Sequence, residues 1–363
     1  MSDNLKRYRA ISAGLKQFFP HRLSARQAQR FQVLAAMING IVGSRTVQLA
    51  AIANKFPVPT QRESRIKRLS RWLQNEAIEQ STYFAPFAAG LLAGLAHQPL
   101  VLVIDGSSIG RGCQCLMVSV VYRKRALPLG WIVFPGKKGH SSEARHREVL
   151  RQIHRLIPDG ATVIVLGDGE FDGVNWLDQM ATWGWFYVCR TAQNAIIYEA
   201  NYRFSFADWG AIPASCHSLE DVRFTDACYG PLTAIAWWRE DCYAPIYLIT
   251  NMALAREACH YYQQRFTIET FFSDQKSRGF HLHKSHLCDP QRLARLLIAA
   301  CLAYIWIIYL GVLAQPKNIR RLIHRTHRCD LSLFQLGLAL LEHWLNLDEP
   351  IRVAFVVPSP GLY

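Results

Sequence analysis

The chain has 363 residues, half of them apolar, which is enough for two or three structural units and excludes a disordered tail protein. Its formal net charge of +14 favours a polyanionic partner, with nucleic acid as the leading candidate; a basic protein without such a partner is the alternative. The N-terminal residues contain no apolar run followed by a small-residue cleavage site, so we expect a cytoplasmic protein rather than a secreted one.

Residues 1–97 are expected to be a mostly helical DNA-binding region. Apolar residues recur at helical spacing through 25–42 and 47–53, and in 63–75 they share one side of a helix whose other side is cationic. With the short helix before it, this segment predicts a helix-turn-helix pair. The side chains predicted to contact DNA are Arg65, Arg68 and Arg71. The alternative is an amphipathic helix with a solvated basic side.

From residue 98 the pattern changes to short apolar runs, and residues 98–190 predict the first part of an α/β core. The expected order is a strand over 100–105, strands over 113–122 and 127–134, a helix over 143–157, a strand over 161–168, a helix from about 172 and a strand over 185–190. The first three strands should form an antiparallel meander, and the later ones should cross over with helices on the faces of the sheet. Lys137 and Lys138, between the third strand and the helix, either touch DNA or are solvated loop charges.

Three further parts follow. Residues 191–252 predict a β-rich insertion, residues 253–315 the second part of the core, and residues 316–363 a C-terminal helical region. The segment 296–314 carries no charge over 19 residues and is long enough to cross a membrane. Its Ala, Cys and Gly content favours a core helix packed tightly against a sheet, so we expect no membrane partner.

Four side chains of the long helix expected over 254–276 share one face. At 100° per residue, spacings of three, four and seven place the four on one narrow stripe: Tyr262, Arg265, Glu269 and Lys276. An acid can hold a divalent metal, and cations and a phenol can hold phosphates. The alternative is a solvated face with helical ion pairs, since Arg265 and Glu269 are four residues apart.

Two upstream acids complete a candidate metal centre with Glu269. Asp105 is expected to end the first strand and Asp168 the fourth, so neighbouring parallel strands would bring both to the edge where α/β sheets place their ligands. Three clustered carboxylates repel one another unless a cation neutralises them, and oxygen ligands favour Mg²⁺ or Mn²⁺, here two ions. Glu170 and Asp172 are rivals of Asp168, but Asp168 directly follows the strand and Asp172 is expected to cap the next helix.

These motifs resemble those of DDE transposases from bacterial insertion sequences, specifically the insertion sequence four type. The resemblance covers roughly residues 25–315: VLVIDGSSI holds the first acid, VIVLGDGEFDG the second, and the spacing Y-x2-R-x3-E-x6-K the third. It implies a ribonuclease-H-like mixed sheet with flanking helices and a β-rich insertion. It also implies that Asp105, Asp168 and Glu269 bind the metal, while Tyr262, Arg265 and Lys276 contact phosphates of the transposon ends.

The resemblance further implies a reaction and partners. Water would attack a phosphodiester at the end of the element, and the released 3′-hydroxyl would attack a second phosphodiester, on double-stranded end and target DNA held by a homodimer in the bacterial nucleoid. Some relatives stack a flipped base on an aromatic residue of the insertion, for which Trp237 and Trp238 are the candidates; buried core is the alternative. The strand before the signature helix, APIYLITN, lacks the tryptophan usual in this family.

Other motifs are weaker. His281, His283, His286 and Cys288 are ligand types that suit zinc, but the second ligand group of a zinc finger is missing. No phosphate-binding glycine loop followed by Lys and Ser or Thr is present, so no nucleotide cofactor is expected. The alternatives to a transposase are a metal-dependent nuclease without strand transfer and a catalytically silent DNA-binding derivative.

Overall fold

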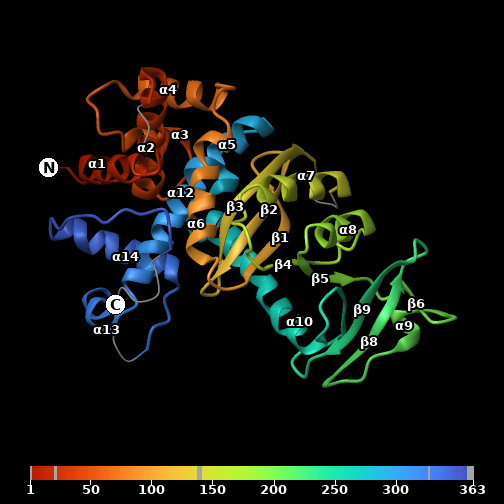
Figure 1. Ribbon diagram of the computed structural model, residues 1–363. Helices are drawn as coiled ribbons and strands as arrows, with labels where there is room; N and C mark the ends of the chain where they lie inside the picture. The colour runs from red at the N-terminus through yellow and green to blue at the C-terminus, as the bar shows by residue number, and fades with distance from the viewer. Residues whose placement is uncertain (1, 20–22, 137–140, 326–327, 358–363) are drawn as a thin grey trace.

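The computed structural model describes residues 2–19, 23–136, 141–325 and 328–357. Its first part, up to the first strand, is a group of helices at one end of the molecule (Figure 1). They are α1 (Asp3–Lys16), α2 (Ala25–Ser44), α3 (Leu49–Asn54), α4 (Arg62–Gln74), α5 (Gln80–Tyr83) and α6 (Ala85–Leu95). The central helix, α2, begins with a capping box in which Ser24 and Gln27 satisfy each other's backbone N–H groups. It packs against α1, α3 and α4, so its buried face organises the group.

The centre of the molecule is a sheet in the order β3-β2-β1-β4-β5. Its strands are β1 (Leu100–Ile109), β2 (Cys113–Tyr122), β3 (Arg125–Pro135), β4 (Val163–Gly167) and β5 (Phe186–Thr191). β1 pairs with β2, and β2 with β3, in antiparallel fashion, whereas β1, β4 and β5 pair in parallel. An antiparallel meander followed by parallel crossover strands is the ribonuclease-H-like arrangement, and the predicted mixed sheet is confirmed.

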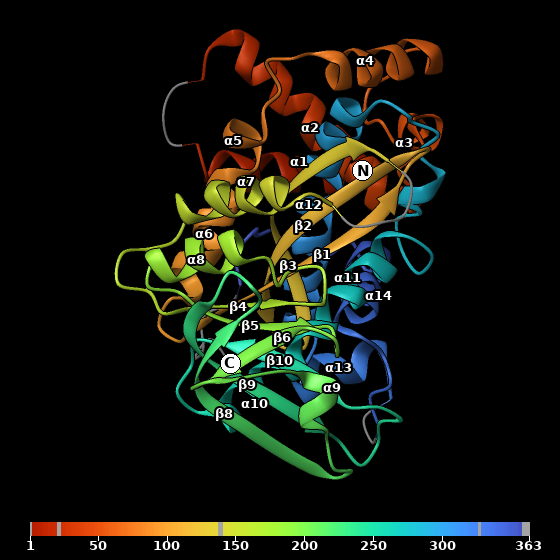
Figure 2. The ribbon, with the colours of Figure 1, turned by 90° about the vertical axis from the view of Figure 1, so that its right-hand side faces the viewer.

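Helices cover both faces of this sheet. α7 (Glu143–His154) packs on β2 and β3 and against α8 (Val174–Thr182), while α11 (Thr267–Gln275) packs on β1 and β3. Figure 2 shows α7 and α8 on one side of the strands and α11 on the other. α11 is the last piece of a segment that begins with α10 (Ala255–Tyr262) and a 3-10 turn, η1 (Gln263–Phe266). A second 3-10 turn, η2 (Leu282–Lys284), follows it.

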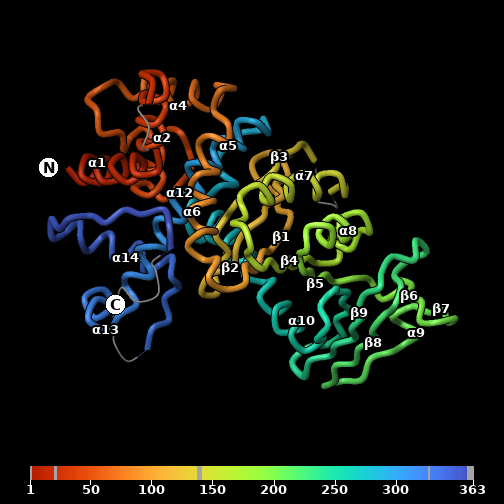
Figure 3. Tube along the Cα trace, viewed as in Figure 1, coloured from red at the N-terminus to blue at the C-terminus, as the bar shows by residue number. Residues whose placement is uncertain are grey.

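The strands between β5 and α10 extend the same sheet. They are β6 (Ile196–Glu199), β7 (Tyr202–Ser205), β8 (Ser215–Phe224), β9 (Tyr229–Trp238) and β10 (Ile246–Thr250), with the short helix α9 (Phe206–Trp209) after β7. β10 pairs antiparallel with β5 and with β9, so the order continues as β5-β10-β9-β8-β6-β7. The trace in Figure 3 places β7 and β8 at the end of the molecule opposite α1.

The longest apolar helix, α12 (Pro290–Leu313), begins after Asp289, whose side chain accepts a hydrogen bond from the Arg292 amide. By length and composition it is the helix of the described chain that could cross a membrane, but 89% of its most apolar 18-residue window is buried inside the protein. It packs against α2, α4, α14 (Leu333–Asn346) and β3, which are the surroundings of a core helix. The exposed helix α13 (Lys317–Ile323) connects α12 to α14.

Candidate active site

Two of the predicted carboxylates lie on neighbouring strands. β1 and β4 pair in parallel with Val103 opposite Leu166, so two more residues in the same register bring Asp105 opposite Asp168. Asp168 directly follows β4, as predicted. Asp105 does not end β1: the strand continues to Ile109 because its last residues pair with the start of β2. Asp105 therefore has fixed backbone on both sides.

Arg265 links the third carboxylate, that of Glu269, to Asp168. Nη2 of Arg265 lies 2.9 Å from Oε1 of Glu269, and Nη1 lies 3.7 Å from Oδ2 of Asp168. The Arg265 side chain is 9% exposed, and its guanidinium lies 4.4 Å from the centre of the Phe266 ring. Residues that are distant in the sequence, from β1, the end of β4 and α11, thus share one cationic neighbour.

The pKa of Asp105 reflects its burial and the charges around it. Burial, and next the negative charge of Asp168, raise the pKa of Asp105 to about 6, and Glu269 adds to the shift. Arg265 and the Gly106 amide, which donates to Oδ1 at 2.7 Å, oppose it. A buried carboxyl with two like charges nearby favours a partner that brings positive charge.

The donor atoms fit a hard divalent cation. All three side chains offer carboxylate oxygens, which are the ligands of Mg²⁺ and Mn²⁺. Within the described residues, no three His, Cys, Asp or Glu side chains stand close enough to form a ligand set as they are. The Arg265 guanidinium instead supplies the positive charge beside Asp168 and Glu269. Charge and donor type therefore match a metal, and Arg265 occupies the space next to two of its candidate ligands.

The signature segment is not one continuous helix. α10 ends at Tyr262, the backbone tightens to a 3-10 turn through Phe266, and Lys276 lies beyond α11 with non-helical φ and ψ of −98° and −97°. A 3-10 turn has three residues per turn, so the rotation assumed for an unbroken α-helix fails across it. The predicted single stripe is wrong for Lys276, because α11 ends at Gln275 and the backbone of Lys276 is not helical.

The two ends of this segment have different surroundings. Tyr262 is 2% exposed, and burial raises its pKa to about 12. Nζ of Lys276 donates to Oγ of Ser107 at 2.6 Å. Because side chains two apart on a strand share a face, Ser107 lies on the same side of β1 as Asp105. The structure thus brings Lys276 to the carboxylate side of the sheet by a tertiary contact.

The rival acids have other partners. Oε1 of Glu170 accepts hydrogen bonds from the backbone N–H and Oγ of Ser141, and Oδ2 of Asp172 accepts one from Oγ1 of Thr191 at 2.7 Å. The prediction that Asp172 caps the next helix is wrong. Gly173 stands at the N-cap of α8, and Glu143 of α7 accepts from the Trp176 amide in its first turn at 2.7 Å.

The cations of α4 face in two directions. Arg65 is bound to the helix before it, donating to the Ala53 carbonyl at 3.2 Å and to Oγ1 of Thr60 at 3.3 Å. Arg68 and Arg71 instead line a groove of about 670 Å³ between α2 and α4. The groove residues are Arg26, Gln29, Arg30, Val33, Ser64, Arg68, Arg71, Trp72 and Asn75.

This α2–α4 groove has four arginines, and none of its described lining residues carries a carboxylate. Arg26 and Arg30 were not among the DNA contacts predicted from the sequence. Their spacing of four residues on the polar side of α2 is a signal, but it does not say that this side faces α4.

The two tryptophans of the insertion are half-buried at the end of β9. Nε1 of Trp238 donates to the Cys242 carbonyl at 3.0 Å, and the Arg239 guanidinium lies 5.6 Å from the centre of the Trp237 ring. Both indoles line a hollow of about 380 Å³ that also contacts Gln263 of the signature segment. The hollow is large enough for an aromatic ring, so the predicted stacking role stays open.

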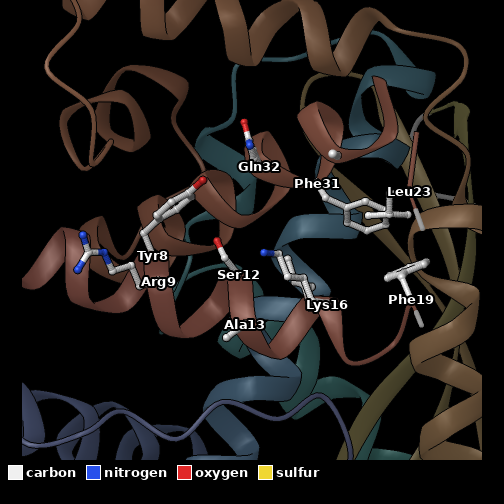
Figure 4. Close-up of a pocket in the computed structure, with 11 residues that line it drawn as sticks. Tyr8, Arg9, Ser12, Ala13, Lys16, Phe19, Leu23, Phe31 and Gln32 are labelled. Carbon is white, nitrogen blue, oxygen red and sulfur yellow. The ribbon is translucent and has the colours of Figure 1, made fainter. Parts of the chain in front are cut away.

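Three remaining predictions and features concern the histidines, a cavity and two lysines. The His281 and His283 rings are 5.8 Å apart and His286 faces Arg111, with no metal-type grouping among the described residues. A cavity of about 460 Å³ lies between α1 and α2, with Phe19, Leu23 and Phe31 at one end (Figure 4). Lys137 and Lys138 lie outside the described residues.

A sequence comparison identifies the family. The family described as "Transposase DDE domain" matches residues 96–306, which is more than half of the chain. The chain belongs to the DDE transposase family. The matched range runs from the end of α6 into α12 and contains Asp105, Asp168 and Glu269, the carboxylates that converge on Arg265. Members of the family generally use divalent metal ions.

Comparison of folds finds a likeness to a solved transposase, the piggyBac transposase synaptic complex with hairpin DNA. The two chains are 12% identical, the alignment covers 95% of this chain and 80% of that one, and the TM-score is 0.46. No curated protein matches the sequence. The family assignment rests on the domain match.

Proposed function

We propose that this DDE transposase cuts and joins phosphodiesters at the ends of an insertion sequence, with Asp105, Asp168 and Glu269 as its catalytic carboxylates. The observation that carries the proposal is the convergence of these three side chains, from β1, the end of β4 and α11, around Arg265. A charge pattern formed only by solvated helix residues would not be expected to lie beside both Asp105 of β1 and Asp168 just after β4.

The three carboxylates would hold the metal, Mg²⁺ or Mn²⁺ and as two ions. Bound there, divalent cations supply activation of the attacking oxygen and stabilisation of the leaving one. The protein's own groups fix the geometry: paired strands hold Asp105 and Asp168, and α11 brings Glu269. Arg265 would exchange its carboxylate contacts for a DNA phosphate, which a guanidinium binds with similar geometry. Tyr262, which is buried close to Arg265, would help to position it, and Lys276 would hold a phosphate beside β1.

We assign the DNA contacts of the N-terminal part, residues 1–97, to the α2–α4 groove. Arg68 and Arg71 retain their proposed role, and Arg26 and Arg30 join them. Arg65 is assigned a structural role because its guanidinium donates to α3 and the α3–α4 connection. Four arginines, with no carboxylate among the described residues that line the groove, form a surface suited to a phosphate backbone.

The remaining assignments belong to the same proposal. The element is of the insertion sequence four type, and the chain divides at 98–190, 191–252, 253–315 and 316–363 as the sequence indicates. Trp237 and Trp238 stack a base at the DNA end. The enzyme assembles as a homodimer on paired double-stranded ends in the bacterial cytoplasm, with neither nucleotide cofactor nor membrane.

A strand-transfer assay tests this function. Purified protein, Mg²⁺ and a labelled DNA end from the element that encodes the chain should give both a cut end and a product joined to target plasmid. Cutting without joining, under conditions where a known transposase joins, would favour the nuclease alternative. Neither product, together with intact DNA binding, would favour the silent derivative.

The groove assignment gives a separate prediction. The double substitution R26Q/R30Q removes two groove cations, so the slope of log K against log salt for duplex binding should become less negative by about 1.8, at roughly 0.9 per lost phosphate contact. Anisotropy titrations of a labelled duplex at several salt concentrations measure this slope. R65Q is the control and should change the slope by less than R26Q/R30Q does. An equal or larger change in slope in R65Q would indicate that Arg65 contacts DNA, as predicted from the sequence.

A further inference from the structure

The turn between β2 and β3 has an unusual sequence for its backbone. Arg123 and Lys124 are its two central residues, closed by the pair Tyr122 and Arg125, and their φ angles are 46° and 62°. A two-residue hairpin turn with both φ values positive strongly prefers Asn-Gly or a similar pair, because left-handed backbone is unfavourable for residues with a large side chain. The chain instead places two long cationic side chains there.

These two charges take no part in the ion pairs of the fold. Within the described residues, no carboxylate forms an ion pair with Arg123 or Lys124, and both are exposed. Arg123 donates to Oε1 of Gln315 and lies 5.5 Å from the centre of the Tyr122 ring, and neither contact neutralises it. The next residue differs, because Arg125 pairs with buried Asp274 at 2.9 Å. The ion pair with Asp274 therefore accounts for Arg125, whereas no ion pair among the described residues accounts for Arg123 or Lys124.

The turn forms one wall of a hollow of about 500 Å³, which we call the turn groove. Its polar lining comes from the turn, from the residues before β1 and from the signature segment: His97, Gln98, Tyr122, Arg123, Lys124, Tyr261 and Gln264. None of the lining residues that the structure describes is an Asp or a Glu. Hydrogen-bond donors and two full positive charges without an acid suit an anion with several oxygens.

The groove lies on the face of the sheet that carries the candidate active site. Val101 lines it, and Val101 and Asp105 are four residues apart on β1, so both point to the same face, roughly 13 Å apart along the strand. Tyr261 and Gln264, at the groove, immediately precede Tyr262 and Arg265. DNA held at the carboxylates would therefore pass close to the groove, since about 13 Å corresponds to roughly four base pairs.

We propose that the turn groove binds the sugar–phosphate backbone of DNA a few base pairs from the cut phosphodiester, with Arg123 and Lys124 as the contacting cations. The inference rests on the proposed function, because it takes DNA as the partner. It also explains the turn: unfavourable backbone retained at a functional surface is expected where the side chains it presents are needed. The contact is to the backbone and is independent of base sequence.

Two double variants separate the charge from the backbone. R123N/K124G removes both cations and supplies the preferred turn pair, so the salt slope of duplex binding should become less negative by about 1.8 and Tm should rise by about 1–3 °C. R123Q/K124Q removes the cations but keeps side chains in left-handed backbone. It should give the same change in slope without the gain in Tm.

The matched control is R151Q/R155Q, which removes two exposed arginines from α7 and its C-cap, on the face opposite α11. Its slope should stay at the wild-type value. Wild-type salt slopes of duplex binding in both turn variants would overturn the proposal. The same result would be expected if an acidic protein segment, and not DNA, occupied the groove. An unchanged or lower Tm in R123N/K124G would overturn the argument from backbone strain. Wild-type protein that binds no DNA would instead contradict the proposed function.

Discussion

Replacing Glu269 with Gln should reduce cutting of an element end by at least about a thousand-fold, since several kcal/mol of lost charge stabilisation corresponds to roughly that factor. The substitution keeps the shape of the side chain and removes its negative charge and one candidate ligand oxygen. DNA affinity should stay close to wild type, because the variant loses an acid and no cation. Single-turnover cleavage of a labelled end and anisotropy titrations measure the two quantities.

The control for this prediction is Glu257→Gln on α10. Glu257 is an exposed carboxylate in the first turn of α10, eight residues before Arg265. The same chemical change there should leave cutting unaltered. Cutting by Glu269→Gln at the wild-type rate would rule out Glu269 as a catalytic carboxylate, and equal losses in both variants would point to a general effect of charge.

Replacing Arg125 with Met should destabilise the protein by at least about 3 kcal/mol at pH 7.5, since removing one partner of a buried ion pair leaves an uncompensated charge. Nη1 of Arg125 lies 2.9 Å from Oδ2 of Asp274, and the two side chains are 15% and 6% exposed. The pair joins β3 to α11, the helix that carries Glu269. Denaturant unfolding measures the change in free energy.

The same pair predicts a dependence on pH. Burial raises the pKa of Asp274 to about 6, against the opposing effect of Arg125. A carboxyl that binds its proton more tightly in the folded state favours folding below pH 4, and this contribution is lost as the pH rises through 6. In Arg125→Met the carboxyl stays protonated to higher pH. The deficit relative to wild type should therefore be about 2 kcal/mol smaller at pH 5 than at pH 7.5, at 1.36 kcal/mol per pH unit over about 1.5 units.

The control is R125M/D274L, which removes both charges and fills the space with apolar atoms. It should recover most of the lost stability and show no extra loss between pH 5 and pH 7.5. A deficit in Arg125→Met that does not change with pH would mean that lost packing of the Arg125 stem, rather than the unpaired Asp274 charge, dominates.

Much of the core follows from local sequence pattern. Alternating and continuous apolar runs predicted the central strands, and their order predicted that Asp105 and Asp168 would be neighbours, as the parallel pairing of β1 and β4 requires. The limits of elements were less accurate. β1 continues past Asp105 because β2 pairs with it, and the signature helix breaks at Gln263. The extra length of β1 comes from its pairing with a second strand, which its own sequence pattern does not contain.

The sequence by itself determined the kinds of residues available: three acids after or within apolar segments, and a large excess of cations. Only the tertiary structure decided what each cation does. Arg65, Arg125 and Arg265 are held by carbonyl or carboxylate oxygens, whereas Arg26, Arg68 and Lys124 line grooves whose described lining residues include no acid. The physical reason is the distance in sequence between partners. Periodicity shows which side of a helix or strand a charged residue occupies, but the residue that binds it belongs to an element distant in the chain.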